Sequence, residues 1–197
     1  MAHSDSPQLL LENRHTGERL AIRRVLRGAE VWFELKGSLP PHREGPPMHI
    51  HFAEDEEGRI AAGSLSAVIE GRQITVGRGQ STTIPRGAAH RWWNEGSEPL
   101  VFEGFAGPAV DLDRYLQAVF DVMNAGAPGR PSLFYMAHVA LRHRRTQAVL
   151  LMPRVLQVAL FRVLVTLGTA LGRYRGNDWP GSPARSAGVP PHVHADA

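Results

Sequence analysis

The 197-residue chain lacks cysteine altogether. This absence excludes a disulfide scaffold, a zinc site with thiolate ligands and a cysteine nucleophile. The first twenty residues also lack a basic start followed by an apolar run of roughly 7–15 residues, so the sequence predicts no secretory signal. We therefore expect a cytoplasmic protein, and its ten histidines direct attention to imidazole chemistry.

Acidic residues are scarce in the C-terminal part of the chain. Residues 122–197 hold nine Lys and Arg against two Asp and Glu, whereas residues 1–121 hold 13 against 17. No acid lies between Val122 and Asn177, a stretch with eight arginines. These are Arg130, Arg142, Arg144, Arg145, Arg154, Arg162, Arg173 and Arg175. A charge split of this kind indicates a change of architecture.

Helical periodicity is missing from the first hundred residues. Short runs rich in Val, Ile, Leu and aromatics recur between Gly, Pro and Asn, and this pattern predicts strands. The expected strands are Leu9–Asn13, Arg19–Leu26, Glu30–Lys36, Pro47–Phe52, Ile60–Glu70, Gln73–Val76, Ser81–Ile84, His90–Asn94 and Leu100–Phe105. Glu70-Gly71-Arg72 is a hairpin signal between two of them. Evenly spaced strands without intervening helices favour an antiparallel sandwich or barrel.

The hydrophobic period changes to that of a helix after Gly107-Pro108. Asp111 is a suitable N-cap for a first helix, and Gly126 a suitable stop. Two more helices are expected over 131–145 and 148–171, the last with Pro153 in its first turn. The chain is thus divided into a β-barrel over 1–108, a basic and apolar helical extension over 109–175, and a Pro/Gly-rich flexible tail over 176–197.

Two short blocks place histidines and a carboxylate together. His49 and His51 point to the same face of a strand, because side chains alternate with period two. Glu56 follows after four residues, enough for the strand to bulge and return a carboxylate, while His90 belongs to another strand. Three neutral imidazoles and one carboxylate can hold one divalent first-row metal ion with positions left for water or substrate. Iron, manganese, nickel, copper, cobalt and zinc all stay open.

The same blocks resemble the two sequence motifs of the cupin superfamily. The first motif is Gly, five residues, His-x-His, three or four residues, Glu, six residues and Gly. Its residues here are His49, His51, Glu56 and Gly63, whereas Gly45 stands two positions after the place of the opening glycine. The second motif is Gly, five residues, Pro-x-Gly, two residues, His, three residues and Asn. It is matched at every position, by Gly79, Pro85, Gly87, His90 and Asn94.

The resemblance covers about residues 40–105 and implies a mostly β fold. That fold is a double-stranded β-helix, the cupin or jelly-roll barrel, here followed by a C-terminal α-helical extension as in some small bacterial cupins. The resemblance also implies His49, His51, Glu56 and His90 as metal ligands. Asn94 is then expected to be a scaffold hydrogen-bonding residue.

Two features of the motif region leave alternatives open. Glu54, Asp55 and Glu57 compete with Glu56 for the role of ligand. Gly58 stands where a large side chain is common, which indicates either a wider pocket or a degraded metal site. Trp92 should face inward with His90, as a substrate wall or as core. The remaining histidines are interpreted as solvated, namely His3, His15, His42, His138, His143 and the pair His192 and His194.

Three function classes follow for a protein acting on a small molecule. The first is a metal-dependent oxidoreductase resembling the dioxygenases that cleave enolised or diketone-like substrates, quercetinase-type ones included, with Glu56 as ligand or base. An isomerase or decarboxylase could use the same site. The second is a non-catalytic cupin that binds or senses a metal or small molecule. The third is a membrane-peripheral protein whose basic helices carry the barrel.

The partners expected from the sequence differ for the two halves. Exposed sheet edges favour a homodimer. The longest uncharged stretch of the helical extension is Val163–Gly172, ten residues, too short to span a bilayer. Residues 148–175 therefore either pack against the barrel or a second subunit, or make a peripheral contact with an anionic membrane. No nucleic acid is expected, because no helix-turn-helix signature is present and the barrel is acidic.

Overall fold

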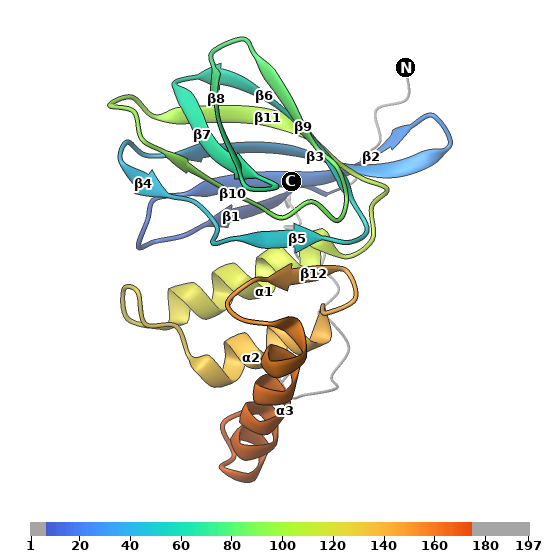
Figure 1. The fold of residues 1–197 in the computed structure, drawn as a ribbon, viewed down its shortest axis with the longest axis vertical. Helices are drawn as coiled ribbons and strands as arrows, with labels where there is room; N and C mark the ends of the chain where they lie inside the picture. The colour runs from blue at the N-terminus through green and yellow to red at the C-terminus, as the bar shows by residue number, and fades with distance from the viewer. Residues whose placement is uncertain (1–6, 175–197) are drawn as a thin grey trace, which may run out of the picture.

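The computed structural model describes residues 7–174, and over this range the chain is mostly β (Figure 1). The strands are β1 (Leu9–Glu12), β2 (Arg19–Arg27), β3 (Glu30–Leu39), β4 (Arg43–Glu44), β5 (His49–His51), β6 (Asp55–Ala62), β7 (Ser64–Ile69), β8 (Arg72–Gly77), β9 (Ser81–Ile84), β10 (His90–Asn94), β11 (Leu100–Gly107) and β12 (Gln147–Val149). The helices are α1 (Leu112–Ala125), α2 (Leu133–Arg142) and α3 (Arg154–Ala170).

The strands form two antiparallel sheets. One has the order β1-β2-β3-β11-β6-β9, and the other the order β12-β5-β10-β7-β8, with β4 paired to β10. The predicted hairpin at residues 70–72 is confirmed, because Glu70 and Gly71 both have positive φ, as its tight turn requires. The strand expected over Ile60–Glu70 is instead divided at Gly63, where a Cβ would lie 2.6 Å from the Pro99 carbonyl oxygen.

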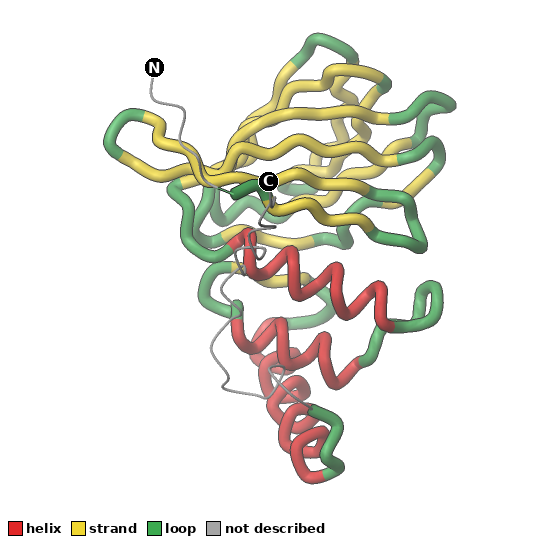
Figure 2. The backbone as a smooth tube through the Cα atoms, turned by 180° about the vertical axis from the view of Figure 1, so that it is seen from behind, coloured by secondary structure: helices red, strands yellow, loops and turns green. Residues whose placement is uncertain are grey.

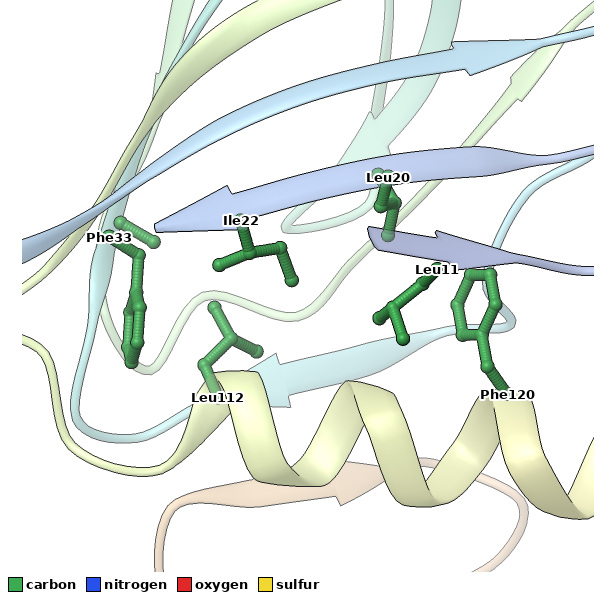
Figure 3. Packing of buried hydrophobic residues seen from close by; sticks show 7 residues of the cluster. Leu11, Leu20, Ile22, Phe33, Leu112 and Phe120 are labelled. Carbon is green, nitrogen blue, oxygen red and sulfur yellow. The ribbon is translucent and has the colours of Figure 1, made fainter. Parts of the chain in front are cut away.

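Two hydrophobic clusters hold this arrangement together. Leu39, Ile60, Val76 and Leu100 form the first, inside the barrel. The second joins the barrel to α1, whose Leu112 and Phe120 point toward side chains of β1, β2 and β3 (Figure 3). Those strand residues are Leu11, Leu20, Ile22 and Phe33. Helix α1 therefore belongs to the core of the β domain, as its apolar spacing of three and four residues favours.

One buried carboxyl group, directly before β2, gives a pH prediction. Glu18 is only 9% exposed, and burial raises the pKa of its carboxyl from 4.5 to about 7. Because the folded state binds the proton more tightly than the unfolded state, Glu18 lowers stability as pH rises from 4.5 toward 7. We expect Glu18→Gln to raise the free energy of unfolding at pH 8 by about 2–3 kcal/mol and to leave it nearly unchanged at pH 4.

Urea unfolding of both proteins at pH 4, 6 and 8 measures this difference. Glu98→Gln, at an exposed glutamate, is the matched control and should not change the pH profile. A Glu18→Gln protein that keeps the wild-type dependence on pH would show that another group causes it.

The three helices lie together beneath the strands (Figure 2). The helix predicted over 148–171 begins later, at Arg154, because residues 147–149 pair as β12 with the edge of β5. An unpaired strand edge offers backbone donors and acceptors that a short apolar segment can satisfy. Helix α1 lies between Asp111 and Gly126 as expected, but the Asp111 side chain makes no capping hydrogen bond and contacts His143 instead. Within residues 7–174, none of the helices has the length and hydrophobicity needed to cross a membrane.

Candidate metal centre

Three imidazoles meet between strands β5 and β10. His49 and His51 lie on β5, and His90 of β10 stands directly opposite His49 in the antiparallel register. Their exposed fractions are 9%, 5% and 1%. The ring centroids lie 4.1 Å apart for His49 and His90, 4.9 Å for His49 and His51, and 5.4 Å for His51 and His90. The two-residue spacing on β5 therefore brings both side chains to one buried point, as predicted.

The nitrogens of this cluster are arranged as metal ligands require. One nitrogen from each of the three rings lies within 4.8 Å of the others. A single ion bound at about 2 Å from each nitrogen spans such a group after a small adjustment. The Nδ1 atoms of His49 and His90 lie 2.8 and 3.0 Å from the carbonyl oxygens of Pro47 and Ala88. These bonds assign the ring proton to Nδ1 and leave Nε2 as the ligand atom.

Glu56, at the beginning of β6, brings a carboxylate to the same cluster. Its Oε1 lies 3.1 Å from Nε2 of His51, and its Oε2 lies 3.4 Å from Nε2 of His90. Nε2 of His90 is buried and makes no hydrogen bond, so this longer contact with Glu56 leaves its hydrogen-bonding capacity unused. A buried polar atom of this kind is unfavourable unless another group binds it. The donor set of three nitrogens and one carboxylate fits a divalent first-row metal.

The three acids that flank Glu56 in sequence point elsewhere. Glu54 is fully buried, whereas Asp55 and Glu57 are partly exposed, and each is bound by a side chain outside the histidine cluster. The partners are Gln147 Nε2 for Glu54 at 3.1 Å, Arg86 for Asp55 at 2.6 Å and Arg27 for Glu57 at 3.0 Å. Among the four consecutive acids, Glu56 is thus the one that contacts the imidazoles.

Electrostatics keep the histidines available as ligands. Burial, together with the neighbouring imidazoles, lowers the pKa of His49 to about 3, and burial also lowers the pKa of His51. Burial opposes charge on His90 too, but the carboxylate of Glu56 raises its pKa. Burial disfavours the Glu56 carboxylate, yet its imidazole neighbours lower its pKa to about 2. At neutral pH the site therefore combines a carboxylate with at least two neutral imidazoles.

A second group of buried polar side chains, which the sequence did not reveal, supports the strand that carries the ligands. Gln147 of β12 is 3% exposed and donates to Glu54, in the loop between β5 and β6. Next to it, His143 is 4% exposed and its Nδ1 lies 2.6 Å from Asp111 Oδ2. The interpretation of His143 as solvated is wrong. Partners 32 and 93 positions apart leave no local pattern that could have signalled either contact.

The motif residues outside the ligand set have structural roles. Asn94 is 1% exposed, and its Nδ2 donates to the carbonyls of Leu39, Pro40 and Glu98, so it acts as the expected scaffold residue. Trp92 packs against the barrel core, with its ring 5.3 Å from that of Phe102.

Two glycines that depart from the first motif differ in what lies next to them. Gly45 allows a close approach, because a Cβ there would lie 2.6 Å from the backbone oxygen of Trp92. At Gly58 a Cβ would meet no heavy atom within 4 Å. By alternation along β6, position 58 shares the inner face with Glu56 and Ile60. The structure therefore leaves room for a larger side chain at position 58.

The fold and the histidine cluster together define a cupin domain. Residues 35–105 match the family described as Cupin domain, so the chain carries a cupin domain over this region. The predicted double-stranded β-helix with C-terminal helices is confirmed. His192 and His194 lie outside the described residues, as does the predicted tail.

Two curated fungal proteins are similar to part of this chain. Oxidoreductase iacF of Pestalotiopsis fici is 38% identical over 94 residues, which cover 46% of this chain and 46% of that protein. Probable oxidoreductase virH of Hypocrea virens is 33% identical over 67 residues, which cover 32% of this chain and 31% of that protein. The chain therefore spans less than half the length of either relative.

Among solved structures, similarity is lower. A variant of oxalate decarboxylase OxdC from Bacillus subtilis is 16% identical with a TM-score of 0.43, covering 53% of this chain and 30% of that one. KdgF from Halomonas sp. is 18% identical with a TM-score of 0.39, covering 47% of this chain and 81% of that one.

Proposed function

We propose that the protein is a metal-dependent cupin oxidoreductase of the dioxygenase-like, quercetinase type. Its substrate would be a small molecule that presents two neighbouring oxygens, as an enolised diketone does. The observation that carries the proposal is the carboxylate of Glu56, held against His51 and His90 at the edge of a buried three-histidine cluster. The oxidoreductase names of the two partial relatives agree with it.

The exposed fraction of each side chain indicates the role that it would have in the site. His49, His51 and His90 are at least nine-tenths buried and would hold the ion. When bound, a divalent first-row metal supplies Lewis acidity toward chelating substrate oxygens and a position for O₂. The side chain of Glu56 is 26% exposed, so it is the most accessible of the four. In the proposed reaction it accepts the hydroxyl proton of the enol form on a carboxylate oxygen.

An oxygen electrode tests this proposal. Protein reconstituted with each candidate metal is mixed with 2,4-pentanedione or a simple flavonol, and O₂ uptake is compared with substrate loss. We expect equal molar consumption of both, and a fall in kcat of about 10²–10⁴-fold in Glu56→Gln. Bound metal is measured in every sample, so that loss of the ion and loss of the base are separated. Glu57→Gln, in the outward neighbour bound to Arg27, is the matched control and should keep full activity.

Two other outcomes would overturn the proposal. Conversion of substrate without O₂ uptake would indicate an isomerase or a decarboxylase. Saturable binding without turnover, for each metal and with both probes, would indicate a cupin that binds or senses its ligand.

A further inference from the structure

Large apolar side chains lie exposed along α3 and the segment that leads into it. Val155 is 82% exposed and Leu156 is 61% exposed. We call the following six residues the α3 apolar face: Val155, Leu156, Leu160, Val163, Leu167 and Leu171, all at least 43% exposed. Leu151 and Met152, just before the helix, are exposed as well. An exposed apolar patch of several large side chains marks a surface that binds a membrane or another protein chain.

The α3 apolar face points away from the rest of the molecule. Helix α3 projects farthest from the barrel, beyond α1 and α2 (Figure 1). Its opposite side is already used, because Gln157 is 6% exposed and Gly168 is buried against Tyr174 and Phe134. A Cβ at Gly168 would lie 2.7 Å from the Tyr174 ring, and the Tyr174 hydroxyl donates to the Phe134 carbonyl. These contacts fix α3 with its apolar face toward solvent.

The charged residues in the sequence around the α3 apolar face are all basic. Between Val122 and Tyr174 there are seven arginines and no acidic residue. Exposed arginines lie before α3, within it and after it, namely Arg144, Arg145, Arg154, Arg162 and Arg173. A second copy of the chain would bring the same positive helices together. An anionic lipid surface offers phosphates for the guanidinium groups and an acyl boundary for the apolar side chains.

The length of α3 also fits a helix that lies in the plane of a membrane. Its 17 residues extend about 25 Å at about 1.5 Å per residue, less than the roughly 30 Å of a bilayer core. Arg162 near its middle would be unfavourable inside that core but can reach the headgroups from the edge of the helix. We propose that the α3 apolar face inserts into the surface of an anionic membrane and holds the barrel there.

Vesicle co-sedimentation of the full chain tests this proposal. Vesicles of phosphatidylcholine alone are compared with vesicles of equal parts phosphatidylcholine and phosphatidylglycerol. We expect binding to the anionic vesicles, binding at least about tenfold weaker to the neutral ones, and weakening by added salt. Leu156→Glu/Leu160→Glu should lower the partition coefficient at least about tenfold, because it places two charges in the inserted face. Leu26→Glu, at a leucine of β2 that is 69% exposed, is the matched control and should bind like wild type.

Light scattering without vesicles tests the alternative that the α3 apolar face binds a second copy of this chain. A monomer that binds anionic vesicles supports the proposal. A dimer that the Leu156→Glu/Leu160→Glu substitution dissociates would assign the α3 apolar face to a second copy of this chain. Equal binding of wild type and the double variant, or no binding to either vesicle, would also overturn the proposal. Metal content and O₂ uptake of the double variant should equal those of wild type, so a failure of the proposed catalytic function is seen separately.

Discussion

Replacing His90 with alanine is expected to lower bound metal from about one ion per chain to below about a tenth of that. His90 is 1% exposed, and its Nε2 is a buried nitrogen that no hydrogen bond satisfies. Its removal leaves His49 and His51 as the only imidazoles of the described cluster. Two imidazoles and a carboxylate hold a first-row ion far more weakly than the complete set. Mass spectrometry of metals in untagged protein, after reconstitution and dialysis, gives the measurement.

His42→Asn provides the control for this experiment. His42 is an exposed histidine with a φ of 53°, a conformation that asparagine accepts, so the variant should fold and retain its metal. Retention of a full equivalent in His90→Ala would place the ion elsewhere. Absence of metal from wild type after reconstitution with each candidate ion would leave a barrel with vestigial ligands and favour the non-catalytic alternative.

Gly104→Ala is expected to destabilise the fold by about 3 kcal/mol or more, the upper range for overpacking. A Cβ at Gly104 would lie 1.9 Å from the backbone oxygen of Glu57 and 3.0 Å from the Cα of Gly58. Both obstacles are backbone atoms of the paired strand, so a side-chain rotation cannot relieve the contact. Strands β11 and β6 would have to separate where β6 leads away from Glu56. Urea unfolding at constant pH measures the loss.

Gly58, which lies directly opposite Gly104, supplies a matched control. Gly58 is paired with Gly104 in the antiparallel register, yet a Cβ at Gly58 meets nothing within 4 Å. Gly58→Ala should therefore change the free energy of unfolding by less than about 1 kcal/mol. Equal losses in the two variants would show that the cost comes from restricting a glycine, and the proposed backbone collision would be wrong.

The parts of this site that sequence could predict are those defined by local spacing. His49 and His51 share a strand, so period-two alternation alone puts them on one face. His90 belongs to the second motif. The resemblance to cupins, rather than any local spacing, implied that its strand lies next to the strand of His49 and His51. The motif match implied Glu56 but left its acidic neighbours as competitors, and in the structure Glu56 is the one of the four whose carboxylate lies 3.1 Å from Nε2 of His51.

The fold shows the same division between local and tertiary information. Alternating runs and turn residues predicted most of the strands of the barrel. The sequence assigns Ala148 and Val149 to the start of the third helix and Gln147 to the connection before it. They become β12 only because the edge of β5 is present to pair with them. The buried His143 was missed for a related reason, since its partner Asp111 is distant in sequence.

The pairing of β12 with β5 also has a consequence for the order of events in folding. One hundred residues separate His49 from its strand partner Val149. Contacts between such distant segments form late, because a long loop must close before they are gained. During synthesis on the ribosome, the edge of β5 that pairs with β12 would stay unpaired until the intervening residues have been added. We therefore expect the ligand-bearing strand to be the last part of the barrel to become protected from hydrogen exchange.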